Sequence, residues 1–227
     1  MKFIIDDANI DKIKEIWEIY PCDGVTTNPS ILAKNKKNPY LTLKEIRDLI
    51  GDEAELHVQV VANDYQGMLL DANTILKELG NHTYVKVPTT PVGLKVMKEL
   101  KRNSINITAT AIYSPMQGYL AGKAGANYVA PYINRIDNLG YNGIEVAKKI
   151  DHIFKNNNMD VKVLAASFKN SYQVVELCEY GIAACTISID IIEGLIRNDS
   201  VAKAVDVFIQ DFEELCGEEK TMSNCIK

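Results

Sequence analysis

The chain has 227 residues, of which 47% are hydrophobic and 24% charged, values typical of a globular protein that argue against disorder, a collagen-like repeat and a coiled coil. The net charge of −5, from 25 basic and 30 acidic residues, argues against binding to nucleic acid or to anionic membranes. No run of 18 apolar residues occurs, so no membrane-spanning segment is expected.

Cysteine usage indicates a reducing compartment. The number of cysteines is odd and no C-x-x-C pair occurs, so we expect free thiols at Cys22, Cys178, Cys185, Cys216 and Cys225. The first residues carry only the short apolar run Phe3–Ile5 before two aspartates, which is not the pattern of a secretory signal. A cytoplasmic protein is therefore expected.

Eight short runs rich in β-branched and aromatic residues predict strands buried on both faces, as in a parallel sheet. In chain order they are Lys2–Asp6, Gly24–Thr27, Leu56–Ala62, Tyr84–Pro88, Ile105–Ile112, Tyr128–Tyr132, Val161–Ser167 and Ala184–Ile189. Helical spacing of apolar residues predicts helices at Asn9–Tyr20, Thr42–Ile50, Tyr65–Leu79, Val92–Arg102, Pro115–Gly125, Gly143–Asn157, Tyr172–Tyr180 and Ile189–Arg197. The second helix is expected to begin with the capping box Thr42-x-x-Glu45.

This alternation predicts a single closed (β/α)8 barrel, a TIM barrel, over residues 1–199. A doubly wound open sheet is the alternative, but such sheets usually open with a G-x-G-x-x-G turn, which the sequence lacks. Residues Ser200–Leu215 predict an extra amphipathic helix with one apolar stripe. We expect residues 200–227 either to cover the barrel or to pack on a neighbouring subunit.

Polar side chains recur near the ends of the predicted strands, where a TIM barrel carries its active site. They are Asp6, Thr26, Asn28, Ser30, Gln59, Lys86, Thr108, Thr110, Tyr132, Arg135, Ser167 and Lys169. Lys86 is the most informative, because strand alternation places it on one face with Tyr84 and Pro88, opposite two valines. A lysine buried inside a barrel tends to lose its proton, and the neutral amine can form a Schiff base with a carbonyl substrate.

Each candidate also has a purely structural interpretation. Lys86 and Asp6 could form an ion pair that serves stability alone. Asp6 could instead cap the first helix, as could Asp7 or Asn9, and Ser30 could cap the helix that follows it. Only the convergence of these residues on one end of the barrel favours a functional role.

The other candidates and the histidines have equally simple interpretations. These are backbone hydrogen bonds for Gln59 and Thr110, a core position for Tyr132, and a surface ion pair between Arg135 and Asp137. The histidines lie on different segments without metal-ligand spacing, so no metal site is expected. His57 is expected to fill the core one layer below Gln59.

Four motifs occur in an order that resembles the transaldolase family, and most of all its small fructose-6-phosphate aldolase branch. They are GVTTNPS at residues 24–30, VKVP at 85–88, VAPYINRID at 129–137 and VLAASFK at 163–169. The resemblance extends over nearly the whole chain. It implies that Lys86 is the Schiff-base lysine, that Asp6 assists proton transfer, and that Thr26 and Asn28 bind the dihydroxyacetone part of the substrate.

The resemblance also implies an anion-binding site and distinguishes the aldolase branch from the larger transaldolases. Arg135 and Ser167 correspond to the residues that bind the phosphate, while Lys169 stands where the larger transaldolases carry an arginine. The larger enzymes usually have glutamate and phenylalanine in place of Gln59 and Tyr132, and asparagine and serine in place of Thr108 and Ala130. In the aldolase branch, Gln59 and Thr110 would hold a water next to the phenol of Tyr132, and the phenol would deliver a proton to the enamine.

The resemblance thus implies a class I aldolase that reversibly cleaves fructose 6-phosphate to dihydroxyacetone and glyceraldehyde 3-phosphate, with no metal or other cofactor. The alternatives are a transaldolase that passes the same three-carbon unit to erythrose 4-phosphate, the same chemistry on a related anionic sugar such as a sulfonated one, and a non-catalytic barrel that binds sugar phosphates. The branch also implies a homodecamer of two stacked pentamers, with the Ser200–Leu215 helix packed on a neighbouring subunit.

Overall fold

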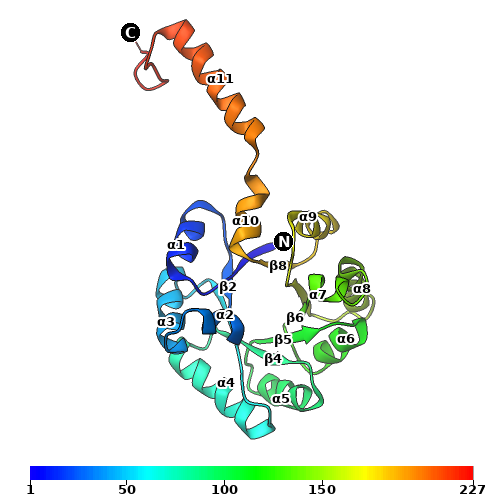
Figure 1. Cartoon of the computed structure of the whole chain (residues 1–227). Helices are drawn as coiled ribbons and strands as arrows, with labels where there is room; N and C mark the ends of the chain where they lie inside the picture. The colour runs from blue at the N-terminus through cyan, green and yellow to red at the C-terminus, as the bar shows by residue number, and fades with distance from the viewer. Residues whose placement is uncertain (227) are drawn as a thin grey trace. The chain divides into compact units, whose positions relative to one another are not determined.

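The computed structural model describes residues 1–226. Within them, eight parallel strands close into a barrel in chain order, and β1 pairs with both β2 and β8. The strands are β1 (Lys2–Asp6), β2 (Gly24–Thr26), β3 (Glu55–Gln59), β4 (Tyr84–Pro88), β5 (Ile107–Ile112), β6 (Tyr128–Pro131), β7 (Lys162–Ala165) and β8 (Ala184–Ile187). The predicted TIM barrel is confirmed, with the strands inside a ring of helices (Figure 1).

The helices follow the strands as expected, with two short additions. They are α1 (Ile10–Ile19), α2 (Pro29–Lys34), α3 (Pro39–Ile50), α4 (Tyr65–Leu79), α5 (Pro91–Arg102), α6 (Pro115–Lys123), α7 (Ile133–Asp137), α8 (Gly143–Asn156), α9 (Ser171–Tyr180), α10 (Ile189–Ile196) and α11 (Asp199–Cys216). The sequence pattern did not predict α2 and α7, which have 6 and 5 residues. Such short helices do not repeat the apolar spacing often enough to be recognised.

The predicted capping box at Thr42 is wrong. Helix α3 begins at Pro39, and the side chain of Asn38 accepts a hydrogen bond from the backbone N–H of Tyr40. Proline suits the first turn of a helix because its missing N–H would have no intrahelical partner there. Thr42 therefore lies inside the helix and is buried.

Several predicted strands extend too far at their carboxyl ends. The run Leu56–Ala62 ends as a strand at Gln59, because the Asp71 carboxylate accepts the backbone N–H groups of Val61 and Ala62 and draws the chain out of the sheet. Strand β7 likewise ends at Ala165. These early ends create the loops that carry the polar residues at the barrel mouth.

A packed polar and aromatic layer forms the floor beneath this mouth. His57 is fully buried, stacks on Tyr84 and shares hydrogen bonds with Thr108 and Glu55, as expected for a core histidine below Gln59. Burial would raise the pKa of Glu55, but hydrogen bonds from His57 and Lys2 lower that pKa to about 2. The floor therefore confines any ligand to the upper part of the barrel.

The chain divides into one compact unit up to Ile192 and a second from Glu193 onward. The second contains α11, along which no residue is buried and whose apolar stripe includes the exposed Val201, Phe208 and Leu215. None of the helices in the described part of the chain has the length and apolar character needed to cross a lipid bilayer.

Candidate active site

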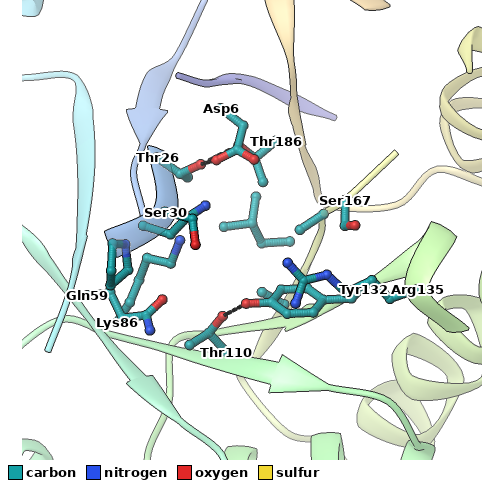
Figure 2. Close-up of a pocket in the computed structure, with 15 residues that line it drawn as sticks. Asp6, Thr26, Ser30, Gln59, Lys86, Thr110, Tyr132, Arg135, Ser167 and Thr186 are labelled. Carbon is teal, nitrogen blue, oxygen red and sulfur yellow. Dashed lines mark hydrogen bonds between the residues drawn. The ribbon is translucent and has the colours of Figure 1, made fainter. Parts of the chain in front are cut away.

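A cavity of about 260 Å³ opens at the carboxyl ends of the strands. Figure 2 shows that its polar side chains converge from all sides of the barrel. The lining residues are Asp6, Thr26, Asn28, Pro29, Ser30, Gln59, Lys86, Thr110, Ala130, Tyr132, Arg135, Leu164, Ala166, Ser167 and Thr186. The structure thus brings together nine of the ten residues that the resemblance assigned to the site, Lys169 being the exception.

Lys86 points into the barrel, as strand alternation predicted. Its side chain is buried, and Nζ donates a hydrogen bond to the backbone oxygen of Thr27 at 2.6 Å. Burial lowers the pKa of Lys86, an effect that the charge of Asp6 opposes. In the described part of the chain the two residues form no direct ion pair. Burial thus makes the neutral form of this amine easier to reach than in an exposed lysine.

A chain of hydroxyl groups holds the Asp6 carboxylate. Thr26 Oγ1 donates to Asp6 Oδ1 at 2.7 Å and lies 2.6 Å from Thr186 Oγ1. Because the single hydroxyl proton of Thr26 goes to Asp6, Thr186 must be the donor to Thr26. Burial raises the pKa of Asp6, although Lys86 and Thr26 oppose this, so the group is suited to exchanging a proton.

Asp6 does not cap the first helix. The side chain of Asn9 takes that role by accepting a hydrogen bond from the backbone N–H of Lys12. This leaves the Asp6 carboxylate free to face the cavity from the last position of β1. The structural interpretation of Asp6 as a helix cap is therefore wrong.

Helix α2 orients the polar residues that follow β2. Asn28 caps this helix, since its Oδ1 accepts the backbone N–H of Ile31 at 3.0 Å. The cap does not use the amide N–H groups of Asn28, which lines the cavity, so they can donate to a substrate hydroxyl. Ser30 lies within the helix and does not cap it, as one interpretation of the sequence had suggested.

Thr110 and Tyr132 meet above the floor. Their hydroxyl oxygens lie 2.7 Å apart. The partner of the Thr110 hydroxyl is therefore a side chain and not the backbone, which one interpretation of the sequence had suggested. The pairing of β5 with β6 shifts register between Ala109 and Ile112, and Ala111 has a left-handed φ of 58°. Such a bulge re-aims neighbouring side chains. Gln59, at the end of β3, pairs in register with Lys86 and lines the same cavity.

Arg135 lies over the ring of Tyr132. Its Cζ atom is 4.6 Å from the ring centroid, and Nη1 donates a hydrogen bond to Tyr113 Oη at 3.5 Å. The Tyr113 ring packs edge-on against Tyr132. Asp137 instead accepts hydrogen bonds from Gly143 N and Gln173 Nε2, so the Arg135–Asp137 surface pair, which was the structural alternative for Arg135, does not form.

Ser167 reaches the cavity from a strained backbone. Its φ of 60° lies in the left-handed region, which is uncommon for a residue with a side chain. In the next turn the backbone N–H of Lys169 donates to Gln173 Oε1, and the Lys169 side chain does not line the cavity. Arg135 and Ser167 thus line this edge of the cavity, and Lys169 does not.

Sequence reasoning missed two residues of the site. Thr186, on β8, completes the hydroxyl chain to Asp6, and Tyr113 supports Arg135 and Tyr132. Thr186 is a polar residue inside an apolar run, the same signal that identified Lys86. Within residues 1–226, no group of three or more His, Cys, Asp or Glu side chains is arranged to hold a metal ion.

Comparison with known proteins gives three findings. Residues 3–225 match the family model described as transaldolase/fructose-6-phosphate aldolase. A relative from Streptococcus pneumoniae, named "Probable fructose-6-phosphate aldolase", is 42% identical over 213 residues, which cover 93% of this chain and 96% of that protein. A relative from Thermodesulfovibrio yellowstonii, named "Probable transaldolase", is 37% identical over 215 residues, which cover 95% and 99%.

Among solved structures, the dihydrodipicolinate synthase of Rhodopseudomonas palustris superimposes with a TM-score of 0.61 at 10% sequence identity. The match covers 82% of this chain and 69% of that one. At this level of identity the likeness supports the barrel fold alone.

Proposed function

Because this chain belongs to the transaldolase/fructose-6-phosphate aldolase family, we propose that it is a class I aldolase that reversibly cleaves fructose 6-phosphate. The products are dihydroxyacetone and glyceraldehyde 3-phosphate. The observation that carries the proposal is the buried amine of Lys86, which shares one cavity with Arg135 and Ser167. Figure 2 shows Lys86 and Arg135 entering this cavity from opposite sides, as a sugar with a carbonyl and a phosphate requires.

The reaction begins with the neutral amine of Lys86. It attacks the C2 carbonyl carbon of the sugar, and loss of one water gives an iminium ion. Asp6 supplies and removes protons in this step, which its raised pKa supports. The iminium ion withdraws electrons from the C3–C4 bond, so the chemistry requires no metal or other cofactor.

Cleavage releases the phosphorylated aldehyde and leaves an enamine on Lys86. Removal of the proton on the C4 hydroxyl turns that carbon into an aldehyde, while the bonding electrons pass into the enamine. The guanidinium of Arg135 and the hydroxyl of Ser167 hold the phosphate through charge-assisted hydrogen bonds. Thr26 and Asn28 bind hydroxyl groups of the three-carbon unit.

Protonation of the enamine decides between cleavage and transfer. We assign this proton to the phenol of Tyr132, acting through a water held by Gln59 and Thr110, after which hydrolysis frees dihydroxyacetone and Lys86. The hydroxyl contact between Tyr132 and Thr110 supports this assignment. The second candidate function is transaldolase activity, in which the enamine instead attacks erythrose 4-phosphate, and the 37% identical relative named a probable transaldolase favours it.

A product assay tests the proposal and separates the two activities. The purified protein is incubated with fructose 6-phosphate, with and without erythrose 4-phosphate. Dihydroxyacetone and glyceraldehyde 3-phosphate in the absence of an acceptor support the aldolase. Sedoheptulose 7-phosphate formed only with the acceptor supports the transaldolase, and no product in either reaction contradicts both.

The assembly and location of the protein are part of the proposal. We propose a homo-oligomer, of decamer size by family resemblance, in which α11 packs on a neighbouring subunit. The exposed apolar stripe of α11 supports this, because such side chains are normally buried in a stable protein. A cytoplasmic location is proposed as well, supported by the five free cysteines.

A further inference from the structure

A second, larger cavity adjoins the proposed catalytic one. It has a volume of about 570 Å³ and is lined by residues of α1, α2 and the start of α10. Asp6, Asn28, Ser30 and Arg135 line both cavities. A ligand chain that passes Arg135 on its way out of the barrel therefore enters this outer cavity directly.

The outer cavity carries three cationic side chains. Its walls include Lys12 on α1 and Lys34 on α2, together with Arg135. Within residues 1–226 none of these three side chains forms an ion pair. Lys34 is close enough to Asp6 to favour its ionised form. The two lysines thus offer an anion charge-assisted donors in the cavity that Arg135 also lines.

The remaining lining residues suit a hydroxylated chain. Asp7 and Asp190 supply carboxylate oxygens, and that of Asp7 also accepts the backbone N–H groups of Ala8 and Asn9. Asn9 and Asn28 use their side-chain oxygens as helix caps, so that their amide N–H groups stay available. Asn35, Ser30 and Ser188 complete the polar wall. Carboxylates and amides of this kind accept from and donate to sugar hydroxyl groups.

We propose that the outer cavity binds the hydroxylated chain and the terminal phosphate of five-carbon aldose phosphates, with Lys12 and Lys34 holding the phosphate. The inference rests on the proposed aldolase function and extends it to longer acceptors. A three-carbon aldehyde places its phosphate on Arg135, whereas a five-carbon aldehyde extends past Arg135 to the two lysines. The enamine carbon on Lys86 attacks the aldehyde carbon and forms one C–C bond, while the π bond of the aldehyde breaks, its oxygen takes up one proton and the enamine becomes an iminium ion. Water then hydrolyses the iminium ion and releases an eight-carbon ketose phosphate.

The test compares acceptors of two lengths with dihydroxyacetone as the donor. For the wild type and the double variant Lys12→Gln/Lys34→Gln, kcat/KM is measured with glyceraldehyde 3-phosphate, ribose 5-phosphate and ribose. The matched control is Lys14→Gln/Lys37→Gln, which removes the same charge from exposed lysines outside both cavities. We expect the first variant to lose roughly a hundredfold or more with ribose 5-phosphate, because each of its two lost charge-assisted hydrogen bonds is worth about tenfold or more in affinity. The kcat/KM of this variant with glyceraldehyde 3-phosphate and with ribose should change less than twofold.

Other outcomes overturn the inference. For the Lys12→Gln/Lys34→Gln variant, these are an equal loss of kcat/KM with both phosphorylated aldehydes, or no loss with ribose 5-phosphate. An equal loss of kcat/KM in the control variant also contradicts it. So does a wild type that ribose 5-phosphate inhibits without being consumed. Activity of the wild type with glyceraldehyde 3-phosphate reports on the proposed function by itself. If that activity is present while the lysine dependence is absent, the outer site is wrong and the aldolase stands; if it is absent, the aldolase itself is wrong.

Discussion

The Nζ atom of Lys86 lies 2.6 Å from the backbone carbonyl oxygen of Thr27 and donates a hydrogen bond to it. This bond uses one N–H of the amine and leaves the lone pair of the neutral form available to a carbonyl carbon. Thr27 follows β2 and is itself buried, with its own N–H bonded to the backbone of His57. The amine that we propose as the nucleophile is therefore oriented by backbone that two neighbouring strands hold in place.

We predict that Lys86 is the lysine that becomes covalently modified. Borohydride added together with fructose 6-phosphate should attach a substrate-derived mass to the peptide that contains Lys86, because reduction makes the Schiff base permanent. Lys86→Ala should abolish both labelling and cleavage. The exposed Lys95 provides the control, since Lys95→Ala should leave both unchanged. Label found only on another lysine would show that the nucleophile is misassigned.

We predict that replacing Asp6 with asparagine shifts the pH dependence of Schiff-base formation to lower pH. Burial lowers the pKa of Lys86, and the negative charge of Asp6 opposes this. Without that charge the pKa of Lys86 falls further, so the neutral amine persists at more acidic pH. The measurement is the initial rate of borohydride trapping with dihydroxyacetone between pH 5 and 10. Asp7→Asn is the control, and a shift to higher pH in Asp6→Asn would contradict the electrostatic assignment.

We predict that Gln59→Glu combined with Tyr132→Phe favours transfer over cleavage. The double variant removes the phenol that lies 2.7 Å from Thr110 and the amide proposed to hold a water. General-acid catalysis contributes about 100-fold or more, so the ratio of dihydroxyacetone release to sedoheptulose 7-phosphate formation should fall at least about tenfold. Gln59→Glu alone keeps the phenol, so its ratio of the two products should lie between those of the wild type and the double variant. An unchanged ratio would mean that other residues decide between cleavage and transfer.

We predict that Arg135→Ala weakens the use of phosphorylated aldehydes and spares unphosphorylated ones. Loss of a charge-assisted contact worth about 1.5–3 kcal/mol should lower kcat/KM with glyceraldehyde 3-phosphate by roughly tenfold to a hundredfold, mainly through KM. With glyceraldehyde the change should be small. Arg135→Lys, which keeps the charge but loses the planar fork, should give an intermediate loss. An equal loss on both aldehydes would mean that Arg135 acts only by packing on Tyr132.

We predict that Phe208→Asp reduces the size of the assembly measured by light scattering. Phe208 is 67% exposed on the apolar stripe of α11, and burial of such a side chain at an interface contributes about 1.5–3 kcal/mol. A buried carboxylate in its place would destabilise the contact. Lys203→Glu on the same helix is the control and should leave the mass unchanged. A monomeric wild type would contradict the proposal, and a variant of unchanged mass would remove α11 from the interface.

The sequence by itself determined the order and type of most elements. Strand β4 is an example, since the apolar run Tyr84–Pro88 predicted both its bounds and the inward direction of Lys86. The two-residue repeat of a strand fixes which side chains share a face, and that repeat is a local property. The four motifs likewise lie within short segments, so the family could be recognised without any contact between them.

The tertiary structure alone decided which residues work together. Thr26 and Thr186 lie 160 positions apart in the chain, yet their hydroxyl groups join to orient Asp6. Whether Asp6 caps a helix or faces the cavity depends on Asn9 taking the cap, a choice among adjacent polar residues that local pattern does not resolve. The outer cavity with Lys12 and Lys34 has no signature in the sequence, because exposed lysines occur throughout the chain. Closure of the barrel brings these distant residues to one mouth, and only the closed sheet fixes their distances.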